Sequence, residues 1–80
     1  MPRANRVLRS IETADGALCV DFFVRVDGTF GFEEYRRDVE DGRGWFPVGA
    51  YSKGIYGSQD KALAVALLKV AWLADVIGTD

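Results

Sequence analysis

The feature that most restricts the fold of this chain is a segment of alternating side chains between two glycine turns. The segment runs from Ala17 to Val26, and an Asp-Gly pair stands at each end, at residues 15–16 and 27–28. Asp-Gly pairs are typical of tight turns because glycine adopts positive φ at no steric cost. Apolar residues recur at every second position, which predicts a strand with one buried face. That face carries Leu18, Val20, Phe22, Val24 and Val26, and the other carries Cys19, Asp21, Phe23 and Arg25.

The buried face also predicts how the next strand, residues 29–38, pairs with this one. Phe30 and Phe32 stand at alternate positions of that strand. A two-residue turn would put both rings on the face opposite Phe22, because a shift of one residue inverts every side chain. A three-residue turn with Gly28 at positive φ instead pairs Phe22 with Phe32 on one face. We predict the second turn.

Two further segments are predicted to lie at the edges of the sheet. Residues 6–12 form the first strand, and their arginines suit an edge because charge discourages pairing with another chain. Residues 45–48 are short and extended. Pro47 has no N–H to donate, which places this piece at an edge or outside the sheet.

The last segment, residues 58–77, is predicted to be one helix. Ser58 is a good N-cap, the interior contains no Gly or Pro, and Gly78 is the expected residue after the C-terminus. The chain is therefore predicted to be one α+β domain spanning residues 1–80. Its antiparallel three- to four-stranded meander sheet and loops occupy residues 6–57, the helix packs on one face, and residues 1–5 are disordered.

Composition excludes several classes of protein. A chain of 80 residues with 49% hydrophobic residues and a net charge of −2 is not a disordered segment. It has no histidine and one cysteine, which removes the usual general base, the commonest metal ligand and any internal disulfide. We therefore predict a non-enzymatic protein with no catalytic residues, no cofactor and no metal. The basic N-terminus is not followed by an apolar run, so we expect a cytoplasmic location.

The predicted helix is apolar on two sides, although one sheet can cover only one of them. The side assigned to the sheet consists of Leu63, Ala66, Leu67, Val70, Leu73, Ala74 and Ile77. The second stripe consists of Val65, Leu68, Trp72 and Val76, with Lys69 at its rim. Three interpretations are open: the N-terminus or the 45–56 loop covers the stripe, a second copy covers it, or a different protein or a membrane surface does. We expect a homodimer. A membrane span is not expected, since Lys69 interrupts an apolar stretch that is too short.

Two aromatic groups supply alternative binding surfaces. The open face of the sheet carries Phe23, Arg25, Tyr35 and Arg37, a combination that single-stranded nucleic-acid binders use for stacking. The net negative charge and a pI near 5.0 argue against that function. The loop after the sheet carries Trp45, Phe46, Tyr51 and Tyr56. These four either close the end of the core or form a groove for a peptide or ligand. Cys19 has no activating histidine, and we expect it to serve packing.

Part of the chain resembles a known group of proteins. The similarity covers residues 32–38 and 40–49, Tyr51 and the helix around Trp72. This pattern resembles short uncharacterised bacterial proteins, mainly from α-proteobacteria. The resemblance implies a single strand-rich domain ending in a helix and brings no activity with it.

The order of elements is also similar to that of the MbtH-like helper proteins of peptide synthetases. Those proteins bind an adenylation domain through tryptophans, to which Trp45 and Trp72 correspond loosely. The residues around both tryptophans depart from that family's motifs, so the similarity is one of topology. It implies a helper subunit that binds a larger enzyme.

Overall fold

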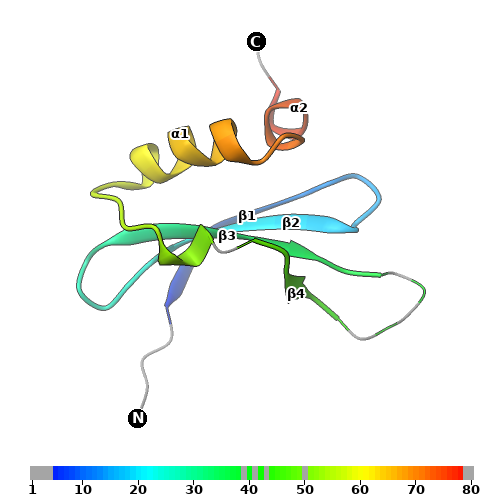
Figure 1. Ribbon diagram of the computed structural model, residues 1–80, viewed down its shortest axis with the longest axis horizontal. Helices are drawn as coiled ribbons and strands as arrows, with labels where there is room; N and C mark the ends of the chain where they lie inside the picture. Colours follow the sequence, from blue (N-terminus) through cyan, green and yellow to red (C-terminus); the bar gives the residue numbers. More distant parts are fainter. Residues whose placement is uncertain (1–4, 39, 41, 43, 50, 79–80) are drawn as a thin grey trace.

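The computed structural model describes residues 5–38, 40, 42, 44–49 and 51–78, and shows a sheet with helices on one face (Figure 1). The prediction for residues 1–5 therefore lies, except at Asn5, outside the described residues. The strands are β1 (Arg6–Glu12), β2 (Leu18–Val24), β3 (Phe30–Arg36) and β4 (Phe46–Pro47). They form a four-stranded antiparallel sheet in the order β1-β2-β3-β4. The predicted α+β meander is confirmed.

The β2–β3 hairpin has the predicted register. Phe22 lies opposite Phe32, and Val24 lies opposite Phe30. Gly28 has a φ of 87°, and its N–H donates to the Arg25 carbonyl at 2.9 Å to close the turn. The glycine is needed at this position because a side chain is strained at positive φ.

Gly28→Ala is expected to destabilise the protein by about 1–2 kcal/mol, because the left-handed conformation costs that much for an L residue. A Cβ at Gly28 would have no heavy atom within 4 Å, so the loss measures backbone strain alone. Gly57→Ala is the matched control, since that site is equally open and its φ is not positive. Urea unfolding measures both free energies. Equal effects of the two substitutions would contradict this assignment.

Both edges of the sheet are poor sites for a further strand. β1 carries exposed Arg6 and Arg9 and has a register shift between Val7 and Arg9. At the other edge, Val48 donates its N–H to the Glu34 carbonyl of β3 at 3.1 Å. Alternation along the strand therefore turns the nitrogen of Pro47 away from β3, toward the side where another strand would need a donor. Charge, a bulge and proline each discourage edge pairing.

The C-terminal segment differs from the prediction of one helix. It forms α1 (Gln59–Lys69) and α2 (Leu73–Ile77), separated at Val70 by extended backbone with φ −103° and ψ 100°. The predicted N-cap is present, because the Ser58 hydroxyl accepts the Lys61 N–H at 3.1 Å. A straight helix over 59–77 would be ~28 Å long, whereas a strand of 7 residues spans ~23 Å. The break keeps Val70 and Leu73 both buried over the small sheet.

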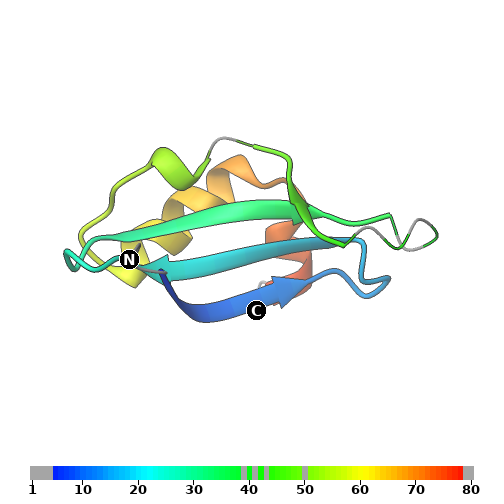
Figure 2. The same ribbon diagram turned by 90° about the horizontal axis from the view of Figure 1, so that it is seen from below.

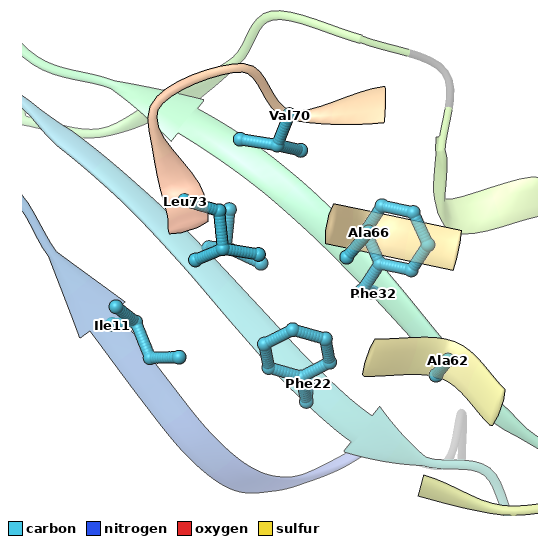
Figure 3. Packing of buried hydrophobic residues seen from close by; sticks show 8 residues of the cluster. Ile11, Phe22, Phe32, Ala62, Ala66, Val70 and Leu73 are labelled. Atoms are coloured by element: carbon cyan, nitrogen blue, oxygen red, sulfur yellow. The ribbon is translucent and has the colours of Figure 1, made fainter. Parts of the chain in front are cut away.

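The face that α1 turns to the sheet consists of small residues. Ala62 and Ala66 are fully buried and pack in one cluster with Phe22 and Phe32 (Figure 3). Small side chains let the helix approach the two rings closely. The predicted sheet face is therefore partly wrong: Ala66, Val70 and Leu73 are buried, but Leu67 and Ile77 are 39% and 36% exposed. The whole buried cluster comprises Ile11, Val20, Phe22, Phe32, Ala62, Ala66, Val70 and Leu73.

A short 3-10 helix, η1 (Tyr51–Lys53), follows β4 beside β3 (Figure 2). After it, Tyr56 and Phe30 exchange both backbone hydrogen bonds, at 2.9 and 3.0 Å. The edge of β3 is thus held at one end by β4 and at the other by Tyr56. Neither α1 nor α2, in the part of the chain that is described, has the length and apolarity to cross a membrane.

Candidate functional site

The structure divides the residues predicted to form the dimer contact. Three of them remain exposed: Leu68, Lys69 and Val76. Leu68 is 86% exposed. The other two, Val65 and Trp72, are partly buried and pack against the core. The indole N–H of Trp72 donates to a carboxylate oxygen of Glu34 at 2.9 Å. The break in the helix and this hydrogen bond prevent the five residues from forming one continuous stripe.

The residues predicted to form an aromatic groove lie on two sides of the sheet. Tyr51 and Tyr56 stack on Phe32, with ring centres 5.3 and 5.9 Å apart, and so close the core on the helix side. Trp45 lines a hollow on the opposite face, and Phe46 is 44% exposed on β4. Of the two interpretations, Tyr51 and Tyr56 fit closure of the core. Since Trp72 bonds to Glu34 on the helix side, the two tryptophans do not share a surface.

The arginine predicted to bind nucleic acid near the β2–β3 turn is used within the chain. The guanidinium of Arg25 lies 5.0 Å from the centre of the Phe23 ring. It also donates to the carbonyls of Ser52 at 2.6 Å, Gly54 at 2.9 Å and Phe30 at 3.1 Å. Phe23 is only 5% exposed beneath it. Neither side chain is presented for stacking with a base.

Arg37 is engaged in the same way at the other end of the sheet. Its guanidinium lies 4.5 Å from the centre of the Trp45 ring, and its Nε donates to the Gly16 carbonyl at 3.2 Å. Tyr35, the remaining residue of that predicted surface, stands beside carboxylates. Burial, followed by the charges of Asp21 and Glu33, raises the pKa of Tyr35. This arrangement does not favour phosphate, because phosphate binding needs free cations.

The face of the sheet that α1 and α2 leave uncovered, here called the outer face, carries an open pocket. Figure 2 looks onto this face, with both helices behind the sheet. The pocket has a volume of about 210 Å³. Alternation brings its walls together, since Ser10 lies opposite Asp21 and Glu12 lies opposite Cys19. The pocket, named here the acidic pocket, is lined by Ser10, Glu12, Cys19, Asp21, Tyr35 and Trp45.

Asp21 organises the floor of the acidic pocket. One of its carboxylate oxygens accepts the Ser10 hydroxyl at 2.6 Å and the Cys19 thiol at 3.3 Å. The pKa of Cys19 is raised to about 12, mainly by burial and then by the hydrogen bond to Asp21 and the charges of Asp21 and Glu12. The thiol therefore stays protonated at neutral pH. The charge in the pocket comes from carboxylates, and the thiol acts as a donor.

Alkylation of Cys19 by iodoacetamide at pH 8 is expected to be about 50-fold slower in the folded protein than in urea-unfolded chain. The reason is that a pKa near 12 leaves far less thiolate than the ordinary value of 9.0, while the higher basicity recovers only part of the rate. Mass spectrometry at several pH values measures the rate, which should still rise at pH 10. A plateau near pH 9 in the folded protein would refute the shift.

Sequence reasoning did not single out Ser10, Glu12 or Asp21 as site residues. The alternation of the strands was a usable signal. It places Asp21 on the face away from the core, and it places Ser10 and Glu12 on the face opposite to that of Ile11. The pairing of β1 with β2 was needed to bring them together. Among the described residues, no three or more Cys, Asp or Glu side chains are placed to hold a metal ion.

Comparisons with family models, with curated proteins and with solved structures found no match to this chain, so the acidic pocket and its surroundings carry the functional argument.

Proposed function

We propose that this protein is a non-enzymatic interaction module that binds another protein across the outer face of its sheet. The observation that carries the proposal is the acidic pocket, which combines carboxylates, aromatic rings and a hydroxyl on a face without helices. Concave sites with a few convergent polar groups are where proteins bind their ligands.

The size of the pocket favours a side chain over a free ligand. Sites for drug-sized molecules usually measure about 300–1,000 Å³. The acidic pocket measures about 210 Å³ and is open to solvent. A partner that inserts one side chain and contacts the surrounding sheet fits these dimensions.

The edges of the sheet and the chemistry of the thiol support the same proposal. The arginines and bulge of β1, and Pro47 at β4, discourage a partner from adding a strand, so it meets a face instead. The raised pKa of Cys19 makes the thiol a poor nucleophile, which favours binding over catalysis. The proposed partner is a cytoplasmic protein. It can be a larger enzyme that this chain serves as a helper subunit.

Site-specific photo-crosslinking tests which face binds. A benzophenone amino acid is placed at Glu12 on the outer face or at Ala64 on the exposed side of α1, and native cells expressing each variant are irradiated. The proposal predicts one defined heterologous product from position 12 and none from position 64. A product from position 64 alone would overturn it.

Self-association through α1 is a second candidate, favoured by the exposure of adjacent leucines. Leu67 and Leu68 are 39% and 86% exposed. Two copies meeting there would bury apolar surface that is otherwise in water.

Sedimentation equilibrium at high micromolar concentration tests the second candidate. Self-association predicts a dimer that Leu68→Glu converts to monomer, because a buried carboxylate without a partner is costly. Ile55→Glu is the matched control, since Ile55 is 70% exposed and lies outside α1 and α2. A monomeric wild-type chain would eliminate the candidate.

A further inference from the structure

We infer that the acidic pocket receives an arginine side chain of the partner protein. This inference rests on the proposed function and specifies its chemistry. It follows from the charge of the pocket, its aromatic walls and the use that the chain already makes of Trp45.

The charge of the pocket calls for a cation. Glu12 and Asp21 line it, and Glu33 lies close enough for its charge to raise the pKa of Tyr35. Among the residues that the structure describes, no lysine or arginine lines the pocket. The neighbouring cation, Arg37, is held over the Trp45 ring and at the Gly16 carbonyl. Of the charged groups that the structure places here, the carboxylates outnumber the guanidinium, and an incoming positive charge is favoured.

The aromatic residues that line the acidic pocket favour a planar cation. Trp45 and Tyr35 contribute rings to the pocket, and the faces of such rings attract cations. The Trp45 ring already holds a guanidinium, that of Arg37, at 4.5 Å. Because Arg37 already covers one face of the indole, an incoming guanidinium meets the Tyr35 ring or the remaining surface of Trp45.

Arginine fits this combination better than lysine does. Its guanidinium is planar, stacks on aromatic rings and donates in a fork that matches a carboxylate. A lysine ammonium is a compact, strongly hydrated point charge and uses only the electrostatic part of the site. A volume of about 210 Å³ admits one such side chain.

Titration of the isotope-labelled full chain with three capped tripeptides tests the inference by NMR. The peptides are acetyl-Gly-Arg-Gly-amide, its lysine analogue and its citrulline analogue, which keeps the shape of arginine without the charge. We expect the arginine peptide to shift the amide signals of Glu12, Cys19 and Tyr35. Its affinity should be about tenfold higher than that of the citrulline peptide, because citrulline loses the ion pairs and the cation–π contact. The lysine peptide should lie between them.

A pair of matched variants locates the binding. Glu12→Gln is expected to weaken the arginine peptide about threefold, as loss of one exposed ion pair does. Glu40→Gln makes the same change on an exposed loop residue outside the pocket and is expected to have no effect. Glu12 is exposed, so its substitution leaves the fold intact.

The possible outcomes separate this inference from the proposed function. Equal binding of the arginine and citrulline peptides, or shifts confined to residues outside the pocket, overturns the inference. If position 12 still crosslinks a partner, the proposed function survives that result. If position 12 crosslinks nothing and position 64 does, the proposed function fails together with the inference.

Discussion

Phe32→Ala is expected to remove about 3–5 kcal/mol of stability, the usual cost of truncating a buried phenylalanine. Phe32 is fully buried, lies 6.0 Å from Phe22 between ring centres, and carries both Tyr51 and Tyr56 on its ring. The substitution therefore loosens the cover of the core as well as the core itself. A domain of this length has about 4–12 kcal/mol to lose. A large fraction of the variant should be unfolded in buffer.

Urea unfolding followed by circular dichroism measures this loss. Phe46→Ala is the matched control because Phe46 is 44% exposed on β4. It is expected to change the free energy of unfolding by less than about 1 kcal/mol. Similar losses from the two substitutions would contradict the placement of Phe32 at the centre of the core.

Arg25→Ala is expected to cost about 2–3 kcal/mol and to release η1 from the sheet, since hydrogen bonds from charged groups contribute about that much. The guanidinium joins the residue after β2 to the carbonyls of Ser52 and Gly54, and the Ser52 N–H donates to the Glu33 carboxylate nearby. Removal of Arg25 leaves these carbonyls without their charged donor. The Phe23 ring also loses the cation above it.

Hydrogen exchange and urea unfolding together measure this effect. The amides of Ser52 and Gly54 should exchange faster, while those in the middle of β2 change only with global stability. Arg36→Ala is the control, because Arg36 is exposed near the other end of the sheet. Unchanged exchange at Ser52 in Arg25→Ala would show that η1 is held by other contacts.

The hairpin was predictable because burial leaves it one register. Phe22 and Phe32 can share a face only if the turn contains Gly28 at positive φ, so alternation and one glycine determine the pairing. The edge position of Pro47 was predictable for a similar reason, since a missing N–H is a local property. These features depend on neighbours in the chain.

The helix and the pocket depend on distant contacts and were not predictable in the same way. The predicted helical arc included Leu67 and omitted Ala62, whereas the rings of Phe22 and Phe32 fill the space and leave room on α1 for the small Ala62 and Ala66. We attribute the end of α1 at Lys69 to the small size of the sheet. The hydrophobic pattern of the helix itself carries no information about that size.

The candidate site shows the same division. Trp45, Tyr35 and Cys19 were named from the sequence, but in three separate groups. Antiparallel pairing of β1 with β2, of β2 with β3 and of β3 with β4 brings them into one pocket with Glu12 and Asp21. Arg25 and Arg37 were predicted to belong to an alternative surface for nucleic acid, but each lies over an aromatic ring and donates to backbone carbonyl oxygen.

The two sheet edges, which are poor sites for a further strand, also bear on how the protein behaves at high concentration. Fibres grow when a sheet accepts identical strands one after another along the hydrogen-bond direction. Here the nitrogen of Pro47 has no proton to offer at β4, and β1 presents positive charge and a bulge at the opposite end. Strands as rich in aromatic residues as these, which carry Phe22, Phe23, Phe30 and Phe32, are an aggregation hazard when an edge is open to pairing. Pro47, the two arginines of β1 and its bulge are therefore expected to disfavour growth of the sheet by edge pairing.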